Sequence, residues 1–363
     1  MIFHGQPAFF SKKFCVYRGK SPIFTHLALL LRFQKKTLEG AVRRLLFFCL
    51  SFLPFSVAIA DDALWESAAV QAFIKELANT HSHEELKSLF VATQKNERVL
   101  ELVAPKNAPR NWEKYRKNFV NPLLVLKGAQ FLKKHAATFK TAEERYGVPR
   151  EIITAIIGIE TQFGKTQGSF STFEVLATLG FYDERRADFF KNELKEFLLF
   201  CKENHFEPLK IKGSYAGALG IAQFMPSSIR KYAVDFDGDG NINLSQSEID
   251  AIGSVAAFLE KHGWEKNAPI AFPADVSALK EDALKPFLEG GIAPTFLVKD
   301  LKTAGVKTSA PDNLRVSVLN FDSPDSVEYW LGAHNLEVIS FYNRSRFYAL
   351  SVFLLALELQ SPF

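Results

Sequence analysis

The sequence predicts a mainly α-helical protein with a small mixed α+β part near its C-terminal end. Apolar residues recur every three or four positions over most of residues 61–264, which is the spacing of one buried helix face. Alternating apolar residues, which are typical of strands, are confined to residues 265–340. The chain has 363 residues, of which 47% are hydrophobic, so it can bury a sizeable core. We therefore expect a leader (1–60), an N-terminal helical domain (61–145), a helical core (146–264), a small α+β domain (265–340) and a C-terminal helix that returns to the core (341–363).

The leader has the pattern of a secretory signal peptide. Four cations precede the apolar run LLFFCLSFLPFSVAIA, and Ala58-Ile59-Ala60 gives a small-residue cleavage site. This pattern predicts export. A membrane-spanning helix is the alternative, but the run contains Pro54 and is shorter than the ~20 residues that a span needs. Bulky residues before Cys49 disfavour a lipid anchor. The cations are Lys35, Lys36, Arg43 and Arg44.

Charge and cysteine content argue against a nucleic-acid-binding protein and against a protein that is stabilised by disulfides. The net charge of +4 comes from the leader, because residues 61–363 hold 35 basic and 39 acidic residues, a net of −4. We expect no nucleic-acid binding, which depends on clustered cations. Removal of the leader leaves Cys201 alone, so the mature chain forms no internal disulfide. We interpret Cys201 as a buried apolar residue rather than a nucleophile.

Helices account for residues 61–145. The segments LWESAAVQAFIKELANTHS and HEELKSLFVATQ each have helical spacing, and the Pro-flanked loop VAPKNAPRN interrupts them. A short segment from Trp112 leads into a long helix that begins near Pro122. We expect its core face to consist of Leu123, Leu126, Ala129, Phe131 and Leu132.

The most informative helix runs through YGVPREIITAIIGIE and brings a carboxylate into line with an apolar face. Pro149 suits the first helical position, and Gly164 suits the left-handed end of the helix. Four isoleucines between residues 152 and 157 form one face, and the same spacing leads to Glu160. Burial disfavours the ionised form, so Glu160 has the properties of a general acid near neutral pH. A structural glutamate that pairs with a cation is the alternative.

A second motif, GSYAGALGIAQFMPSS over residues 213–228, combines small residues with one amide. Small residues allow another chain or a ligand to approach the backbone closely. Together with YGVP…IxxIE-T-x-FG, this motif resembles the lytic murein transglycosylases of the B type, from about Trp112 to the C-terminus. The resemblance implies a periplasmic enzyme that cleaves the glycan strands of peptidoglycan on a lysozyme-like helical core. It also implies that Glu160 is the catalytic acid.

The resemblance further implies a set of sugar-binding residues. A tyrosine ahead of the long helix lines the groove in this family, and Tyr115 holds that position; a surface-packing tyrosine is the alternative. Ser214 is expected to orient the carboxyl of Glu160, and Gln223 to bond a sugar substituent. The family's Arg-Tyr-Asn motif is kept here as Tyr342 and Asn343.

An arginine pair and two departures from the family complete the predicted groove. Residues 170–206 read as two or three helices that carry Arg185 and Arg186. In the family this pair faces the peptide-bearing side of the glycan, where a guanidinium can clamp a carboxylate; ordinary surface cations are the alternative. Phe341 replaces the arginine of the Arg-Tyr-Asn motif, and Phe258 stands at an expected groove tyrosine.

The segment DFDGDGNINLSQSEID, residues 235–250, resembles a calcium loop of the EF-hand type. Its acids stand at positions 1, 3 and 5, its glycine at position 6, and position 12 is Gln246 instead of the usual Glu. The family has a lengthened loop that ends on an Asp of the next helix, which leaves Asp250 and Glu248 as candidates. We expect a structural Ca²⁺; an acidic turn that binds nothing is the alternative. The predicted ligands are Asp235, Asp237, Asp239, Asn241 and Asp250.

The predicted reaction needs one carboxylate. Glycosidases usually employ two, but only Glu160 is marked by a motif. The resemblance implies that Glu160 protonates the bond between N-acetylmuramic acid (MurNAc) and N-acetylglucosamine (GlcNAc), and that the muramyl C6 hydroxyl closes a 1,6-anhydro ring. A hydrolytic muramidase and a noncatalytic, calcium-stabilised peptidoglycan-binding protein are the alternatives. We expect a monomer whose partners are glycan strands and cell-wall synthesis proteins.

Overall fold

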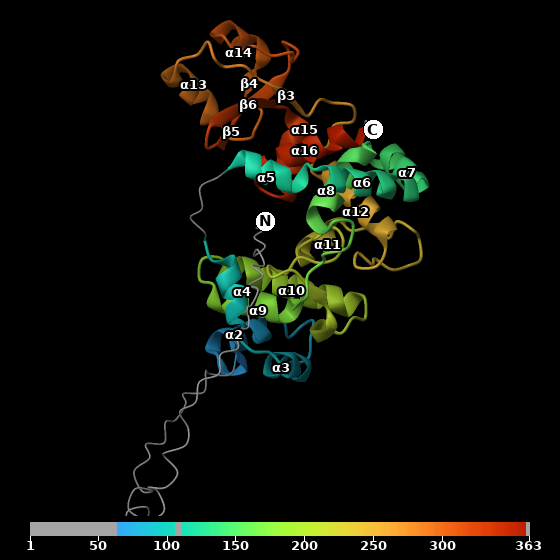
Figure 1. Ribbon diagram of the computed structural model, residues 1–363. Coiled ribbons are helices and arrows are strands. Elements are labelled where there is room, and N and C mark those ends of the chain that lie inside the picture. The colour runs from blue at the N-terminus through green and yellow to red at the C-terminus, as the bar shows by residue number, and fades with distance from the viewer. Residues whose placement is uncertain (1–63, 106–110, 361–363) are drawn as a thin grey trace, which may run out of the picture. The chain divides into compact units, whose positions relative to one another are not determined.

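The computed structural model describes residues 64–105 and 111–360. The predicted leader and signal peptide, and part of the Pro-flanked loop, lie outside these residues. These described residues belong to one compact unit by their contacts (Figure 1). No helix in the described part of the chain is both long enough and apolar enough to cross a membrane.

The first helices pack against the arginine-bearing segment of the core. His81 reaches the carbonyl oxygen of Leu198, and the ring of Phe90 lies 5.2 Å from that of Phe173. The sequence starts these helices with side-chain caps, because Ser67, Ser82 and Asn96 each accept a backbone N–H three residues later. The elements are η1 (Leu64–Glu66), α2 (Ala68–Glu76), α3 (His83–Val91), α4 (Glu97–Val103), α9 (Thr172–Tyr182) and α10 (Ala187–Glu203).

The next helices are α5 (Trp112–Phe119), α6 (Pro122–Lys134) and α7 (Ala136–Tyr146), and they correct two predictions. The single long helix expected from Pro122 is divided at His135 into α6 and α7, and the predicted core face of α6 is wrong in part. Leu123 and Leu126 of α6 are 61% and 48% exposed. The buried residues of α6 are Leu124, Val125, Gly128 and Phe131. Both sets have helical spacing, so periodicity alone could not choose between them. Gly128 decides the face, because a Cβ there would lie 2.6 Å from the side chain of Leu359 on α16.

The acid-bearing helix, α8 (Arg150–Thr161), is buried along almost its whole length. It packs against α6, α12 (Glu248–Lys261) and α16 (Arg346–Gln360). Pro149 is the N-cap rather than the first helical residue, one position earlier than predicted. The left-handed end begins at Gln162 (φ 51°), before Gly164 (φ 82°), because the chain turns so that Thr161 can bind the second motif. The Thr161 hydroxyl donates to the carbonyl of Ile221 and accepts from the N–H of Gly164.

A short antiparallel pairing joins the segment that follows the first motif to the start of the second motif. Strand β1 (Phe170–Ser171) pairs antiparallel with β2 (Lys212–Gly213), and η2 (Pro208–Lys210) precedes β2. Gly168 (φ 99°) permits this approach, because a Cβ there would lie 2.0 Å from the carbonyl oxygen of Gly213. Helix α11 (Pro226–Tyr232) follows the second motif.

The mixed part contains a four-stranded antiparallel sheet in the order β3-β6-β5-β4, with its own apolar cluster. Strand β5 confirms the strand predicted at 315–322. The chain returns to the core through two helices rather than the single one expected, because the backbone is extended at Asn343 (φ −146°). The elements are β3 (Ala271–Pro273), α13 (Glu281–Leu288), β4 (Phe296–Leu297), α14 (Val298–Ala304), β5 (Arg315–Ser323), β6 (Ser326–Gly332) and α15 (His334–Tyr342).

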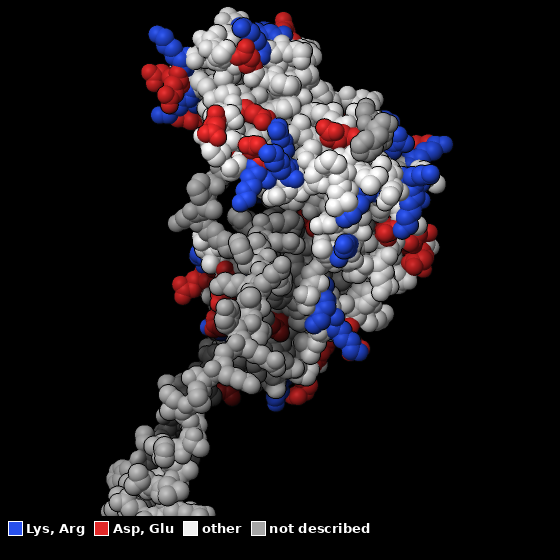
Figure 2. Space-filling model, viewed as in Figure 1, with Lys and Arg blue, Asp and Glu red and all other residues white. Residues whose placement is uncertain are grey.

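Acidic and basic side chains are mixed on the face shown in Figure 2. Several form exposed ion pairs, such as Arg98 with Glu101 and Lys117 with Glu113. Exposed pairs of this kind contribute little stability, about 0–1 kcal/mol each. The apolar core therefore holds the fold together.

Candidate active site

Glu160 lies on the last turn of α8, and its side chain is enclosed. The residue is 5% exposed. Burial raises the pKa of Glu160 to about 7, because the ionised carboxylate loses its hydration. The hydroxyl of Tyr348 opposes this effect and lowers the pKa. That hydroxyl makes no hydrogen bond within ordinary geometric limits, so we interpret it as a loose contact that favours the carboxylate. The group is thus poised to hold or release a proton near neutral pH.

Three tyrosines from three helices surround this carboxyl. Burial, and then the charge of Glu160, raise the pKa of Tyr115, Tyr342 and Tyr348 well above the ordinary value, so all three remain neutral donors. The hydroxyl of Tyr342 donates to the carbonyl of Ala222 at 2.5 Å, which ties α15 to the second motif. Sequence reasoning missed Tyr348. No local signal marks Tyr348, which is one of several aromatic residues in the apolar final segment.

A cavity of about 250 Å³ lies against Glu160, and four other predicted site residues line it. Glu160 is the sole carboxylate among the described residues of this lining. Aromatic rings and small residues make up much of the rest, a combination of apolar surface and few polar groups that suits a bound sugar. The lining residues are Glu160, Arg186, Phe189, Phe190, Ala216, Ala218, Gln223, Phe224, Met225, Ser228, Phe258, Phe341, Tyr342, Asn343 and Arg344.

The structure separates the arginine pair, which lies in the turn between α9 and α10 rather than on a helix as predicted. Arg186 lines the cavity, where its guanidinium lies 4.4 Å from the ring centre of Phe189 and 4.8 Å from that of Phe190. Arg185 instead makes two hydrogen bonds to the buried Asp183, at 2.9 and 3.0 Å. Asp183 thereby holds Arg185 in a structural pair, whereas Arg186 is the member that lines the cavity.

Gln223 and Ser214 are oriented by the backbone of their own motif. The Nε2 of Gln223 donates to the carbonyl oxygens of Gln167 (3.1 Å) and Gly220 (2.9 Å). Its Oε1 is then the atom left to accept a hydrogen bond from a ligand. The Oγ of Ser214 accepts the N–H groups of Ala216 (3.3 Å) and Ala218 (3.0 Å), so it keeps a proton to donate. Ser214, like Tyr115 and Arg185, is not among the residues that line the cavity.

Two features of the groove were not predicted. Arg344 adds a second cation to the lining of the acid cavity. It follows Asn343 directly, so its place beside the retained Tyr-Asn pair was the available signal. A larger cavity of about 580 Å³ adjoins the first and shares Ser228, Phe258 and Phe341 with it, although Glu160 is not part of its wall. The two phenylalanines at the family's tyrosine and arginine positions thus form an apolar boundary between the cavities.

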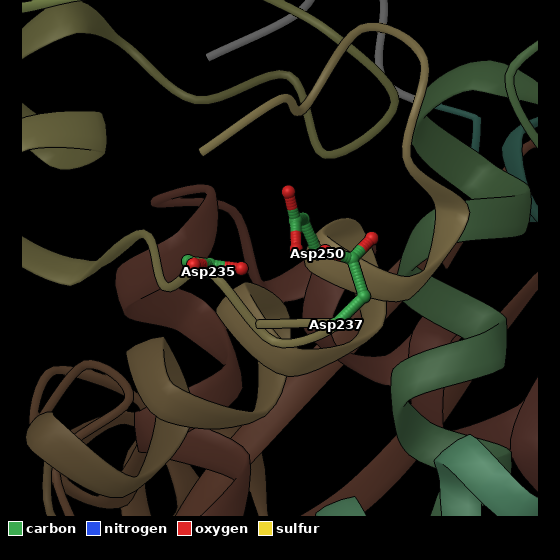
Figure 3. Close-up of side chains that lie close together, drawn as sticks. All are labelled: Asp235, Asp237 and Asp250. Carbon is green, nitrogen blue, oxygen red and sulfur yellow. The ribbon is translucent and has the colours of Figure 1, made fainter. Parts of the chain in front are cut away.

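The acidic loop brings three of its predicted ligands together (Figure 3). One carboxylate oxygen from each of Asp235, Asp237 and Asp250 lies within 4.8 Å of the others. Asp250 is only 1% exposed, and its two oxygens accept the N–H groups of Phe236 and Asn243 at 2.8 Å. Hard oxygen ligands of this kind fit a calcium ion.

The remaining candidate ligands of the loop have other contacts. Glu248 pairs with Lys134, and one of its oxygens lies 2.6 Å from the Nε2 of His135. Asp239 accepts the N–H of Asn241 and is outside the group of three. Of the two candidates for the last ligand, the geometry therefore favours Asp250 over Glu248.

Comparisons with known proteins show the family of the chain. The profile of the transglycosylase SLT domain matches residues 66–357. The membrane-bound lytic murein transglycosylase B of Escherichia coli (strain K12) is 38% identical over 296 residues, which cover 78% of this chain and 80% of that one.

Solved structures are similar over the same part of the chain. The soluble lytic transglycosylase SltB1 of Pseudomonas aeruginosa is 40% identical with a TM-score of 0.75, covering 80% of this chain and 98% of that one. The Escherichia coli lytic transglycosylase Slt35, solved in complex with calcium, is 36% identical with a TM-score of 0.73, covering 81% of this chain and 93% of that one. SltB3 of Pseudomonas aeruginosa, solved in complex with NAG-NAM-pentapeptide, is 29% identical with a TM-score of 0.71, covering 81% of this chain and 79% of that one.

The predicted helical, lysozyme-like fold class is confirmed by these neighbours together with the helical structure of the chain. The matched profile spans well over half of the chain, and the curated relative shares more than a third of its residues. The chain belongs to the transglycosylase SLT domain family, as its motifs around Glu160 and Ser214 predict.

Proposed function

We propose that the protein is a peptidoglycan lytic transglycosylase. It cleaves the β-1,4 bond between MurNAc and GlcNAc and leaves 1,6-anhydromuramyl ends. One observation carries this proposal: a single enclosed carboxyl, Glu160, has a pKa of about 7 and faces a cavity whose described residues offer no second carboxylate. Such a site supplies one acid and no separate enzyme nucleophile, and a hydroxyl group of the substrate can take that part.

In the first step Glu160 acts as the general acid. It gives its proton to the glycosidic oxygen, the bond from that oxygen to the muramyl C1 breaks, and the GlcNAc unit leaves with a hydroxyl group. Positive charge develops on the muramyl ring, and the new carboxylate lies beside it in a site where little water screens the attraction. The hydroxyl of Tyr348 helps to hold the carboxylate at this stage, because its contact favours the ionised form.

In the second step the same carboxylate acts as the base. The muramyl C6 hydroxyl attacks C1, the new C1–O6 bond closes the anhydro ring, and the hydroxyl proton passes to Glu160. The acid is restored and no water is consumed. Burial aids this step as well, since it makes the carboxylate more basic than an exposed one. An intramolecular attack is also favoured by proximity.

The sugar and peptide contacts follow from the orientation of the lining residues. The Oε1 of Gln223 accepts a hydrogen bond from the glycan, and Tyr342 and Asn343 line the same cavity. Ser214 and Tyr115 act from beside the cavity on the carboxyl of Glu160. Arg186 and Arg344 attract the carboxylates of the stem peptide. Arg185 supports Arg186 through Asp183 rather than by binding a ligand directly.

A calcium ion held by the acidic loop is the proposed structural cofactor. Asp235, Asp237 and Asp250 would hold it, with Asp239 and Asn241 as the remaining ligands of the loop. The ion has no chemical part in bond cleavage; it fixes the loop against α12. Binding of calcium by the structural neighbour Slt35 supports the assignment.

The periplasm is the proposed location. The name of the curated relative, a murein transglycosylase, supports it, and the signal peptide predicted within residues 1–60 stays a prediction. The proposed partners are glycan strands and cell-wall synthesis proteins, and the proposed state is a monomer.

Digestion of purified sacculi tests the proposal. The mature protein, from residue 61, is expected to release fragments whose muramyl ends are 1,6-anhydro by mass spectrometry. Reducing muramyl ends would instead identify a hydrolytic muramidase. Glu160→Gln is expected to abolish release while glycan binding persists, since the amide keeps the shape but has no proton to give. Release by this variant would contradict the assignment of the acid, and binding without release by the unmodified protein would identify a noncatalytic binding protein.

A further inference from the structure

Gln167 contacts three segments that the sequence treats separately. Its Nε2 donates to the carbonyl oxygen of Gly164, at the end of α8 (3.1 Å), and to that of Ser245, in the segment that leaves the acidic loop (3.0 Å). Its main-chain oxygen accepts the Nε2 of Gln223 from the wall of the acid cavity (3.1 Å). The half-buried side chain of Gln167 therefore ties the end of the acid helix to the segment that leaves the acidic loop, and the main chain of the same residue holds the sugar-binding amide of Gln223.

The orientation of the Gln223 amide depends on this contact. Its two Nε2 partners, on Gln167 and Gly220, are both carbonyl oxygens, so the nitrogen is fixed on that side. Gln223 also holds the left-handed backbone conformation (φ 51°), which a non-glycine residue adopts only when its surroundings impose it. If the carbonyl of residue 167 moved, Oε1 would lose its fixed direction toward the cavity.

The position of Ser245 depends in turn on the acidic loop. Asn243 donates its N–H to the Oδ2 of Asp250 at 2.8 Å, and the carbonyl of Leu244 accepts the N–H of Ile221 at 2.7 Å. The segment 243–245 is thus held on one side by a predicted metal ligand and on the other by the second motif. A cation that draws Asp235, Asp237 and Asp250 together would fix this segment in place.

We propose that Gln167 is a positioning residue that couples cation binding at the acidic loop to sugar recognition by Gln223. The inference rests on the proposed function for both ligands, calcium and glycan. Such coupling is reciprocal: if calcium tightens glycan binding by some factor, glycan tightens calcium binding by the same factor. If the calcium loop only stabilises the fold, no such reciprocal change in the two affinities is expected.

Calorimetry on the Glu160→Gln form measures both factors without turnover. A GlcNAc–MurNAc oligosaccharide is titrated at saturating Ca²⁺ and after chelation, and Ca²⁺ is titrated with and without saturating oligosaccharide. We expect about fivefold tighter binding in each direction, near the lower end of typical coupling. Equal affinities with and without the second ligand would overturn the inference.

Gln167→Met in the same background isolates the brace, because it keeps the size of the side chain and removes the donor. We expect both coupling factors, the effect of Ca²⁺ on oligosaccharide affinity and the reverse, to fall to about one. Thermal unfolding checks that the variant is folded. Gln246→Met is the matched control, since this exposed glutamine of the same loop should keep the fivefold factor. A Gln167→Met form that keeps the factor would overturn the inference. Failure of the proposed function is distinct: no form would bind the oligosaccharide, while Ca²⁺ binding persisted.

Discussion

Glu160 shows how burial alone can give an ordinary side chain the proton affinity that general acid catalysis needs. No cation among the described residues pairs with it, and a tyrosine hydroxyl is the only side-chain group that draws its pKa down. The loss of hydration therefore dominates, and it raises the proton affinity of Glu160 to the range of neutral pH. The structural alternative, a glutamate paired with a cation, does not describe this site.

The first prediction concerns the pH dependence of the reaction. Because the proposed cycle begins with Glu160 protonated, kcat/KM for soluble glycan should fall above a pKa of about 7, approaching tenfold per pH unit. Initial rates between pH 5 and 9 measure this. A rate that stays constant to pH 9 would contradict the role of Glu160 as the acid.

The second prediction concerns stability. The folded pKa of Glu160, about 7, lies above the ordinary value of 4.5, so the folded state binds the proton more tightly than the unfolded state. Its stabilising contribution is complete below pH 4.5 and is lost as the pH rises through 7. Relative to Glu160→Gln, the unmodified protein should therefore lose up to about 3 kcal/mol of unfolding free energy between pH 4.5 and 8.5. Urea denaturation of both forms at the two pH values gives this difference, and a constant difference would show that burial does not shift the pKa.

At the scale of elements, helix α6 shows where periodicity stops being informative. Leucines stand at 123, 124 and 126, so two faces with helical spacing are available. The choice is made by Gly128, which lets α16 approach closely. Helix α8 differs, because it is buried on all sides and its isoleucines leave no alternative face.

The third prediction follows from that contact. Leu124→Ala removes a side chain that is 6% exposed and should cost about 2–4 kcal/mol of unfolding free energy. Leu126→Ala removes the same atoms from a residue that is 48% exposed and should change stability by less than about 0.5 kcal/mol. Denaturant unfolding of the pair measures both. Equal losses would mean that the face through Leu126 is buried after all.

At the scale of the whole molecule, distant parts of the chain converge on one site. The acid comes from α8, the amide from the second motif, the arginine from the segment before α10, and two tyrosines from α15 and α16. Trp112 of α5 joins these parts to the mixed region, since its ring lies 4.8 Å from Phe321 of β5 and 5.2 Å from Phe347 of α16. The site therefore depends on the packing of the entire described chain.

The fourth prediction concerns the ion. Calcium at about one hundred times its dissociation constant should add about 2.7 kcal/mol to the free energy of unfolding, and a chelator should remove it. Asp237→Asn should abolish the gain, because an exposed ligand is lost without disturbing the core. Asp300→Asn makes the same charge change on an exposed part of α14 and should keep the gain. Thermal unfolding with and without chelator compares the three forms, and an equal response of the two variants would argue against the loop as the site.

The sequence by itself determined the helical class, the strand at 315–322, the acid helix and the family, because each is encoded in residues that are neighbours along the chain or on one helix face. Only the tertiary structure decided which arginine lines the cavity, which acid joins Asp235 and Asp237, which face of α6 is buried, and that Tyr348 and Arg344 lie at the site. Each of these depends on contacts between residues far apart in sequence. Arg185 is held by a buried aspartate and Glu248 by Lys134 of α6, and the close approach of α16 at Gly128 selects the buried face of α6. Local spacing carries no information about such partners, since the free energy that selects them arises only when the elements pack.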